Sequence, residues 1–171
     1  PSLLASLCKE YELDQFVHIS ALGIDTSTDS KYAASKLEGE KKIKELFPST
    51  TILRPSVVYS VDDNFTTTFM TLLSRLPIFP LYYNGETKFM PIHCSDLTDI
   101  IFKVINDEIK SELIECGGPE VLSFKDIVET LMQLIQKKRL LLPLPLFFGN
   151  IIAKTMEFLP HPLLTTDQLK L

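Results

Sequence analysis

The chain has 171 residues, of which 45% are hydrophobic and 23% are charged, a balance typical of globular proteins rather than disordered or collagen-like ones. This length suffices for one ordinary domain, or for the larger part of a protein with two lobes. The formal net charge of −5 argues against a nucleic-acid-binding surface, so no nucleic-acid partner is expected.

The first third of the sequence alternates between predicted helices and strands. In chain order the elements are a helix at 2–13, a strand at 16–20, a polar loop at 23–30, a helix at 31–47 and a strand at 51–54. Pro48 ends the second helix and Pro55 ends the second strand. Alternation of this kind favours a parallel sheet with right-handed crossovers, so the predicted fold class is α/β.

The rest of the chain mixes helices with short strands. Helices are expected at 63–75, 95–107 and 123–137, and strands at 78–83, 88–92 and 112–116. Ser123 and Asp126 form a capping box that opens the last of these helices. The apolar stretch at 140–152 is broken by prolines and is shorter than the roughly 20 residues of a spanning helix, so no transmembrane segment is predicted.

Two structural parts are expected. Residues 1–60 are assigned to the carboxyl-terminal part of a Rossmann-like, dinucleotide-binding domain. Residues 61–171 are assigned to a small α+β substrate lobe, interleaved with a last Rossmann strand at about 112–116 and followed by a helical tail at about 140–171. Because the sequence starts at Pro1 within helix-forming residues and lacks a signal-peptide pattern, we expect it to be a carboxyl-terminal fragment.

Tyr32 and Lys36 lie four residues apart in a predicted helix and therefore share one face. An ammonium group beside a phenol favours the phenolate, which makes the pair a candidate general acid/base. Ser20 ends the preceding strand, where ligands gather in open α/β sheets, and its hydroxyl suits a hydrogen bond to a substrate carbonyl. The same spacing also occurs on ordinary solvated helix edges, but the flanking strands favour a catalytic site.

Metal and disulfide sites are not expected. The three cysteines lie far apart and none forms a CxxC pair. His93, Cys94 and Asp96 are close in sequence, but neighbouring strand positions point to opposite faces and no distant fourth ligand is evident. We expect Ser95 or Asp96 to cap the following helix. His18 is expected to be a histidine satisfied within the sheet rather than a catalytic one.

Charged residues gather at two places. Those of the helix at 31–47, expected on a solvated face, are Glu38, Glu40, Lys41, Lys42, Lys44 and Glu45. The second group, at 137–139, is basic and precedes the apolar segment from Leu140 to Pro160. A basic cluster beside apolar residues suits an anionic membrane surface, although the pattern also fits an ordinary helix end followed by core.

Five segments follow one another as they do in extended, atypical short-chain dehydrogenases/reductases of the epimerase/dehydratase type. They are HISALG (18–23), YAASKLEGE (32–40), TILRPSVVY (51–59), PIHCSDLTDII (91–101) and ECGGPEVLSF (115–124). Within this family the chain most resembles the branch of the dehydrogenase-like accessory subunit of respiratory complex I and its bacterial relatives. The segments 142–160 and 165–171 resemble the tail of that branch, so the resemblance covers nearly the whole chain.

The resemblance implies roles for individual residues. In the family, the residue matching Ser20 positions the substrate carbonyl, and the one matching Tyr32 transfers the proton and also contacts the cofactor. The one matching Lys36 bonds the nicotinamide ribose and tunes the residue matching Tyr32. The residues implied to line the nicotinamide through backbone contacts are Pro55, Ser56, Val57 and Val58. The implied cofactor of the full-length protein is NAD or NADP.

Two departures from the family pattern concern glycine. None of the six glycines belongs to the GxxGxxG fingerprint that holds the pyrophosphate, so this chain alone is expected to bind dinucleotide weakly or not at all. Ser60 occupies a position where relatives usually have glycine, which predicts a different turn after Tyr59.

Three functions are considered, of which the first two follow from the resemblance and the third from the absent glycine-rich loop. The first is a dinucleotide-binding accessory subunit of a respiratory NADH:quinone oxidoreductase, with complex I subunits as partners. The second is an active NAD(P)-dependent oxidoreductase or epimerase, and the third is a cofactor-free scaffold. For the first, the expected location is cytoplasmic or on the mitochondrial matrix side, peripheral to the inner membrane through Leu140 to Pro160.

Overall fold

The computed structural model describes residues 1–27 and 29–145, which form two compact units that interleave in sequence. The first unit comprises Pro1–Ser56 and Ile92–Gly117. Among the described residues, the second unit comprises Val57–Pro91 and residues 118–145. Each unit has buried apolar side chains of its own and is held together by its own sheet pairings.

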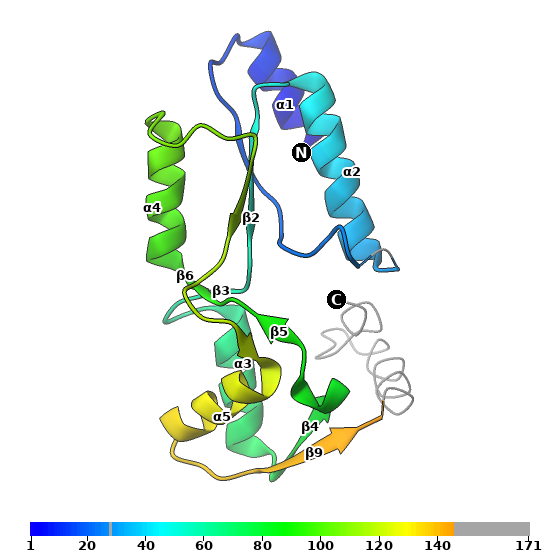
Figure 1. Ribbon diagram of the computed structural model, residues 1–171, viewed down its shortest axis with the longest axis vertical. Coiled ribbons are helices and arrows are strands. Elements are labelled where there is room, and N and C mark those ends of the chain that lie inside the picture. Colours follow the sequence, from blue (N-terminus) through cyan, green and yellow to red (C-terminus); the bar gives the residue numbers. More distant parts are fainter. Residues whose placement is uncertain (28, 146–171) are drawn as a thin grey trace. The chain divides into compact units, whose positions relative to one another are not determined.

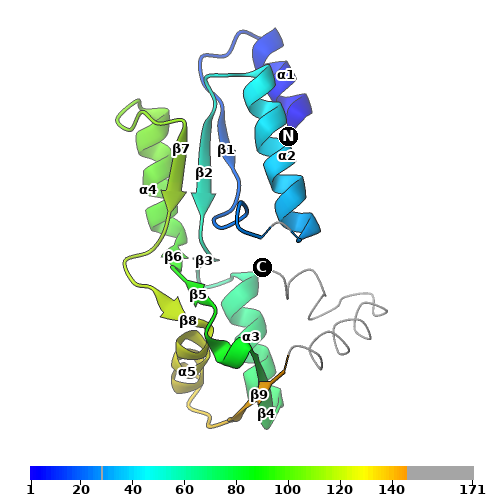
Figure 2. The ribbon, with the colours of Figure 1, turned by 45° about the vertical axis from the view of Figure 1, so that its right-hand side comes forward.

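The first unit is an α/β sandwich. Its elements are α1 (Ser2–Glu10), β1 (Val17–Ile19), α2 (Lys31–Leu46), β2 (Thr51–Pro55), β6 (Ile92–His93), α4 (Cys94–Ile105) and β7 (Leu113–Cys116). Three strands form a parallel sheet in the order β1-β2-β7, with α1 and α2 on one side and α4 on the other (Figures 1 and 2). The predicted α/β class with a parallel sheet is confirmed.

Local signals explain why α2 and β2 form where they do. The Ser30 side chain accepts a hydrogen bond from the Ala33 amide and so caps the start of α2, while Pro48 follows its end. All five residues of β2 are buried, as expected for a central parallel strand covered on both faces. Ile43 on α2 packs with Ala5 and Phe47, which joins α1 to α2.

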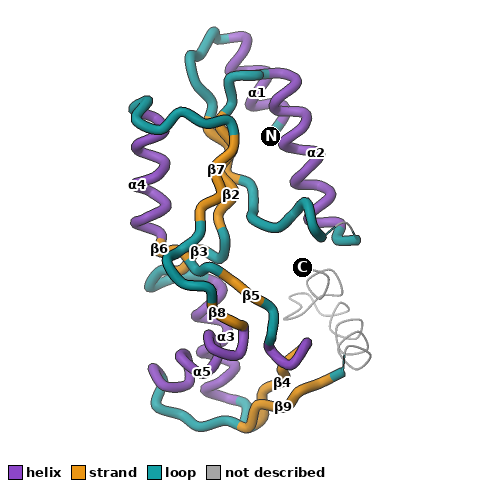
Figure 3. Tube along the Cα trace, viewed as in Figure 1, coloured by secondary structure: helices purple, strands orange, loops and turns teal. Residues whose placement is uncertain are grey.

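The second unit mixes helices with two-stranded sheets. Its elements are β3 (Val58–Tyr59), α3 (Asn64–Arg75), β4 (Ile78–Tyr82), the 3-10 turn η1 (Tyr83–Gly85), β5 (Lys88–Phe89), β8 (Leu122–Ser123), α5 (Phe124–Leu134) and β9 (Leu140–Leu144). Strand β4 pairs with β9 in parallel and β5 with β8 in antiparallel fashion (Figure 3). The core residues are Leu73, Phe79, Leu81, Ile127, Val128 and Leu131. The predicted Ser123–Asp126 capping box is present.

Two sequence predictions were wrong in detail. The expected helical tail at 140–171 begins with strand β9. Its Pro143 is tolerated because, among the described residues, the strand pairs with β4 alone. Residues 146–171, including most of the segment up to Pro160, lie outside the described residues. The cap of α4 is His93, whose ring accepts from the Ser95 amide, rather than Ser95 or Asp96, because the helix already begins at Cys94.

The basic cluster at 137–139 has a structural use in the second unit. Arg139 donates from Nε to the Leu73 carbonyl at 2.5 Å and from Nη2 to the Ser74 carbonyl at 3.2 Å. Lys137 donates to the same Ser74 carbonyl at 3.0 Å. These carbonyls belong to the last turn of α3. Both side chains therefore supply hydrogen bonds that these carbonyls lack within the helix, and their positive charges oppose the negative end of the helix dipole. Within residues 1–27 and 29–145, no helix has the length and apolar character needed to span a membrane.

Candidate active site

Ser20 lies directly after β1, at the carboxyl end of the parallel sheet. Its amide donates to the Leu53 carbonyl on β2 at 2.7 Å, and only 5% of the residue is exposed. Its hydroxyl has no hydrogen bond of ordinary geometry to any described residue. A buried polar group without a partner is rare and unfavourable. This orphaned hydroxyl therefore fits a site in which a ligand oxygen supplies the missing hydrogen bond.

Tyr32 and Lys36 lie on the first two turns of α2. The Lys36 Nζ atom is 5.7 Å from the centre of the Tyr32 ring, so the two side chains share one face of the helix. Tyr32 is 43% exposed, which leaves the ring accessible to a ligand. The pair thus places a cation over the face of the phenol ring.

Glu40, one helical turn beyond Lys36, links this face of α2 to the sheet. Burial raises the pKa of its carboxyl, but hydrogen bonding to Arg54 and, more weakly, the nearby Ser20 hydroxyl bring the pKa below its ordinary value. Glu40 is 7% exposed, so its expected place on a solvated face was wrong. Glu38 and Lys42 of the same run do form a solvated pair at 2.5 Å.

Arg54, on β2, holds Glu40 through a bidentate ion pair that was not predicted from the sequence. Its Nε donates to Glu40 Oε1 at 3.0 Å and its Nη2 to Glu40 Oε2 at 2.8 Å. Its Nη1 donates to Asp25 Oδ2 at 3.1 Å. Arg54 is 7% exposed, and a charged residue inside a buried strand was the available signal that such a partner must exist.

His18 stands on β1, two residues before Ser20, and is half-buried. Burial lowers the pKa of its imidazole, the Lys36 ammonium lowers it further, and Glu40 opposes both effects. The neutral imidazole is therefore favoured at neutral pH. Because Arg54 follows Leu53, the β2 partner of Ile19, and bonds both oxygens of Glu40, the end of β1 and the Glu40 turn of α2 lie close together.

The four residues expected beside the nicotinamide are divided between the units. Pro55 and Ser56 belong to the first unit, with Ser20, Tyr32 and Lys36, whereas Val57 and Val58 belong to the second. The Pro55 carbonyl accepts from the Leu22 amide and the Ser56 amide donates to the Cys116 carbonyl, both at 2.9 Å. These two backbone groups are thus engaged within the first unit, and the role of all four residues stays a prediction.

No metal centre can be built from the described residues, because they contain no group of three or more His, Cys, Asp or Glu side chains placed to hold an ion. The His93 ring lies against the Ser95 hydroxyl at 2.7 Å. A cavity of about 650 Å³ occurs in the second unit, lined by Leu81, Glu86, Lys125, Glu129, Arg139 and neighbouring residues. None of the predicted site residues lines it.

Comparison with known proteins supplies the family. A family model described as the RmlD substrate binding domain matches residues 25–142. The chain is 27% identical over 172 residues to NADH dehydrogenase (ubiquinone) 1 alpha subcomplex subunit 9, mitochondrial, of Dictyostelium discoideum, a match covering 98% of the chain and 48% of that protein. The chain thus spans about half the length of this curated relative.

Two further matches concern reductases. Over 82 residues the chain is 32% identical to the ceramide reductase of Caulobacter vibrioides, covering 48% of this chain and 26% of that protein. The structure of dTDP-4-dehydrorhamnose reductase from Bacillus anthracis in complex with NADP superposes with a TM-score of 0.70 at 20% identity, covering 86% of this chain and 57% of that one. Together these matches confirm the resemblance that the motifs indicated.

Proposed function

The chain belongs to the family of the RmlD substrate binding domain, and from this premise we propose that its protein is a nicotinamide-dinucleotide-binding accessory subunit of a respiratory NADH:quinone oxidoreductase. One observation carries the proposal: the similarity to the Dictyostelium discoideum protein extends over 98% of the chain. The Tyr32–Lys36 pair and the orphaned Ser20 hydroxyl support the dinucleotide part, because they would suit a nicotinamide and a carbonyl.

When bound, the dinucleotide would supply or accept a hydride. Lys36 would hold the ribose hydroxyls, Ser20 would hold a carbonyl oxygen in its buried position, and Tyr32 would carry the proton. The chain contains no glycine-rich phosphate loop, so tight binding would need a segment outside residues 1–171. The protein to test is therefore the full-length one.

Two measurements test this proposal. Calorimetric titration of the full-length protein with NADH and with NADPH should give saturable binding to one of them. An affinity-tagged protein should co-purify with the other complex I subunits in fixed stoichiometry and run with the complex on a native gel. Saturable binding without co-purification would reject the accessory-subunit role and leave the cofactor role standing.

The second candidate is an active NAD(P)-dependent reductase or epimerase. The specific observation in its favour is the 32% identity to ceramide reductase over 82 residues, together with the presence of Ser20, Tyr32 and Lys36. It predicts turnover of a carbonyl or hydroxyl substrate that Tyr32→Phe abolishes. Absence of saturable dinucleotide binding would reject both cofactor functions and favour the third candidate, a scaffold that holds no cofactor.

Location and membrane contact complete the proposal. The Dictyostelium relative is named as mitochondrial, and we infer the matrix side of the inner membrane, or the cytoplasmic side in a bacterium, for this protein. Contact through Leu140 to Pro160 is supported by the exposure of Leu140 at 61% and Leu142 at 43% on β9. Sedimentation with anionic vesicles should decrease in a Leu140→Glu/Leu142→Glu variant and persist in a Val121→Glu control, a residue exposed at 57% outside this segment.

A further inference from the structure

Ser20 and Arg54 occupy the same level of two neighbouring strands. The register of β1 and β2 pairs Ile19 with Leu53, so the next residues along the two strands are Ser20 and Arg54. Residues in register on parallel strands point to the same face of the sheet. The bonds from Arg54 to Glu40 identify that face as the one covered by α2. The orphaned hydroxyl and the buried guanidinium therefore lie side by side beneath this helix.

Glu40 continues the helix face that carries the proposed acid/base pair. Tyr32, Lys36 and Glu40 follow one another at intervals of four residues, so they lie in one row along α2. Both oxygens of Glu40 are bound by Arg54, and both side chains are buried, at 9% and 8% exposure. A two-pronged contact between planar groups fixes orientation as well as distance, so it sets the rotation of α2 over the sheet.

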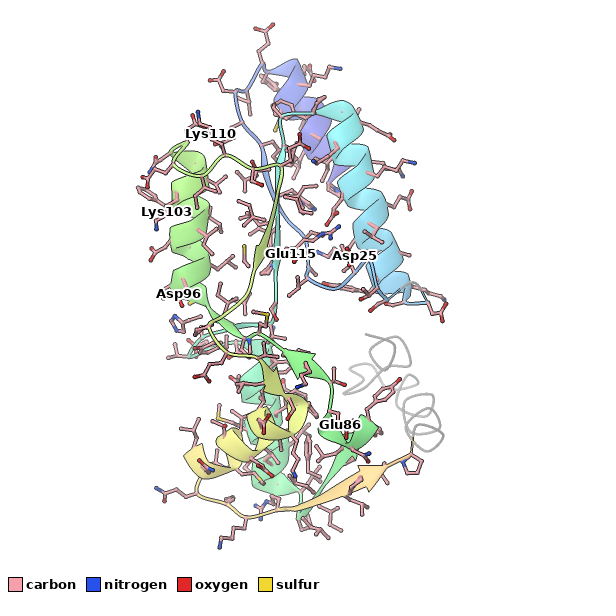
Figure 4. All side chains as sticks on the ribbon, in the orientation of Figure 1. Asp25, Glu86, Asp96, Lys103, Lys110 and Glu115 are labelled. Carbon is pink, nitrogen blue, oxygen red and sulfur yellow. The ribbon has the colours of Figure 1, made fainter. Side chains whose placement is uncertain are left out.

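Asp25 extends the same contact to the loop between β1 and α2. Its carboxylate accepts from Arg54 Nη1 at 3.1 Å, and Figure 4 shows it in this loop beside α2. One guanidinium thereby joins the end of β2, the middle of α2 and the loop that connects Ser20 to Tyr32. These are the three segments whose relative placement decides the geometry of the candidate site.

We propose that Arg54, with Glu40 and Asp25, is a positioning group that aligns the Tyr32–Lys36 face with Ser20. The ligand of the aligned site is the carbonyl or nicotinamide of the proposed function, on which this inference rests.

A purely structural role makes a different prediction. A buried ion pair adds little net stability, because the loss of hydration offsets the attraction, and apolar side chains of similar size can replace it. The double variant Glu40→Leu/Arg54→Met should therefore keep its urea midpoint while losing the alignment. We expect its dissociation constant for the dinucleotide to rise at least about tenfold, and that of Arg54→Lys, which keeps the charge but not the fork, to rise several-fold.

The matched control is Glu112→Gln. Lys44 on α2 pairs with Glu112 at 2.6 Å, an exposed ion pair that also ties this helix to the sheet side of the first unit. Its loss should leave dinucleotide binding unchanged. If the double variant retains both stability and full affinity, Arg54 has no positioning role.

A readout without cofactor separates this inference from the proposed function. The imidazole of His18 senses Lys36 and Glu40, so an NMR pH titration of its ring, identified by its loss in His18→Asn, reports their arrangement. In Arg54→Lys the fork that fixes both Glu40 oxygens is lost, so the carboxylate is free to move toward His18 and the pKa of His18 should rise. If the wild-type protein binds no dinucleotide, the proposed function fails. The His18 titration then tests the positioning role of Arg54 by itself. An unchanged His18 titration in folded Arg54→Lys would overturn the inference.

Discussion

The Lys36 amine lies 5.7 Å from the centre of the Tyr32 ring, one helical turn further along α2. In the proposed function, these two neighbouring side chains have different roles that mutations can separate. Lys36 would contribute a charged hydrogen bond to the cofactor, whereas the hydroxyl of Tyr32 would act in proton transfer.

Replacing Lys36 by Met should weaken dinucleotide binding by the full-length protein roughly 10- to 100-fold, the loss expected for hydrogen bonds from a charged donor. Tyr32→Phe should leave binding nearly intact and, if the protein turns over a substrate, reduce the rate about 10²- to 10⁴-fold. Calorimetry measures the first effect and cofactor absorbance the second. Lys42→Met, on the solvated side of α2, is the control and should behave as wild type.

Ser20→Ala should separate stability from function. Its hydroxyl is buried without a hydrogen bond of ordinary geometry, so removing it should change the free energy of unfolding by less than about 1 kcal/mol. Binding of a carbonyl ligand should weaken because its acceptor loses a donor. The control is Thr50→Val, which removes a buried hydroxyl that does donate, to the Phe47 carbonyl at 2.7 Å, and should cost about 1 kcal/mol. Urea titration would contradict this account if Ser20→Ala were the less stable variant.

Local signals explain which parts of the fold were predictable. The start and end of α2 follow from Ser30 and Pro48, which act on adjacent residues, and the alternation of elements indicated the parallel pairing of β1 with β2. Strand β9 was missed because its apolar run has no helical or strand periodicity. Its conformation is set by pairing with β4, whose partner residues lie about 60 positions earlier.

In the candidate site, too, the local features were predictable and the tertiary contacts were not. Tyr32 and Lys36 were found because their spacing on one helix places them together. Glu40 looked like one member of a solvated run, and only the fold reveals that its turn of α2 lies over Arg54. The pairing depends on the rotation of the helix over the sheet, a tertiary property that no local pattern specifies.

His18 predicts a pH dependence of folding. Burial, followed by the Lys36 ammonium, lowers its pKa in the folded chain below the ordinary value of 6.5, so the unfolded chain binds the proton more readily. Its contribution to stability is complete above pH 6.5 and is lost as the pH falls from 6.5 through the folded pKa. Urea midpoints at pH 7.5, 6.5 and 5.5 should decrease in the wild type and decrease less in His18→Gln. Parallel decreases in both proteins would contradict this assignment.

Arg139 should stabilise the second unit by completing the end of α3. Its guanidinium bonds the carbonyls of Leu73 and Ser74, which have no partners within the helix, and its charge opposes the helix dipole. Arg139→Ala should lower the free energy of unfolding by about 1.5–3 kcal/mol, the range for charged hydrogen bonds. Lys138→Ala, at the neighbouring position outside these contacts, should change it by less than about 0.5 kcal/mol. Because a lysine can still donate a hydrogen bond, Arg139→Lys should lose less of the free energy of unfolding than Arg139→Ala, as measured by urea titration. Equal losses in Arg139→Ala, Arg139→Lys and Lys138→Ala would mean that α3 does not depend on this cap.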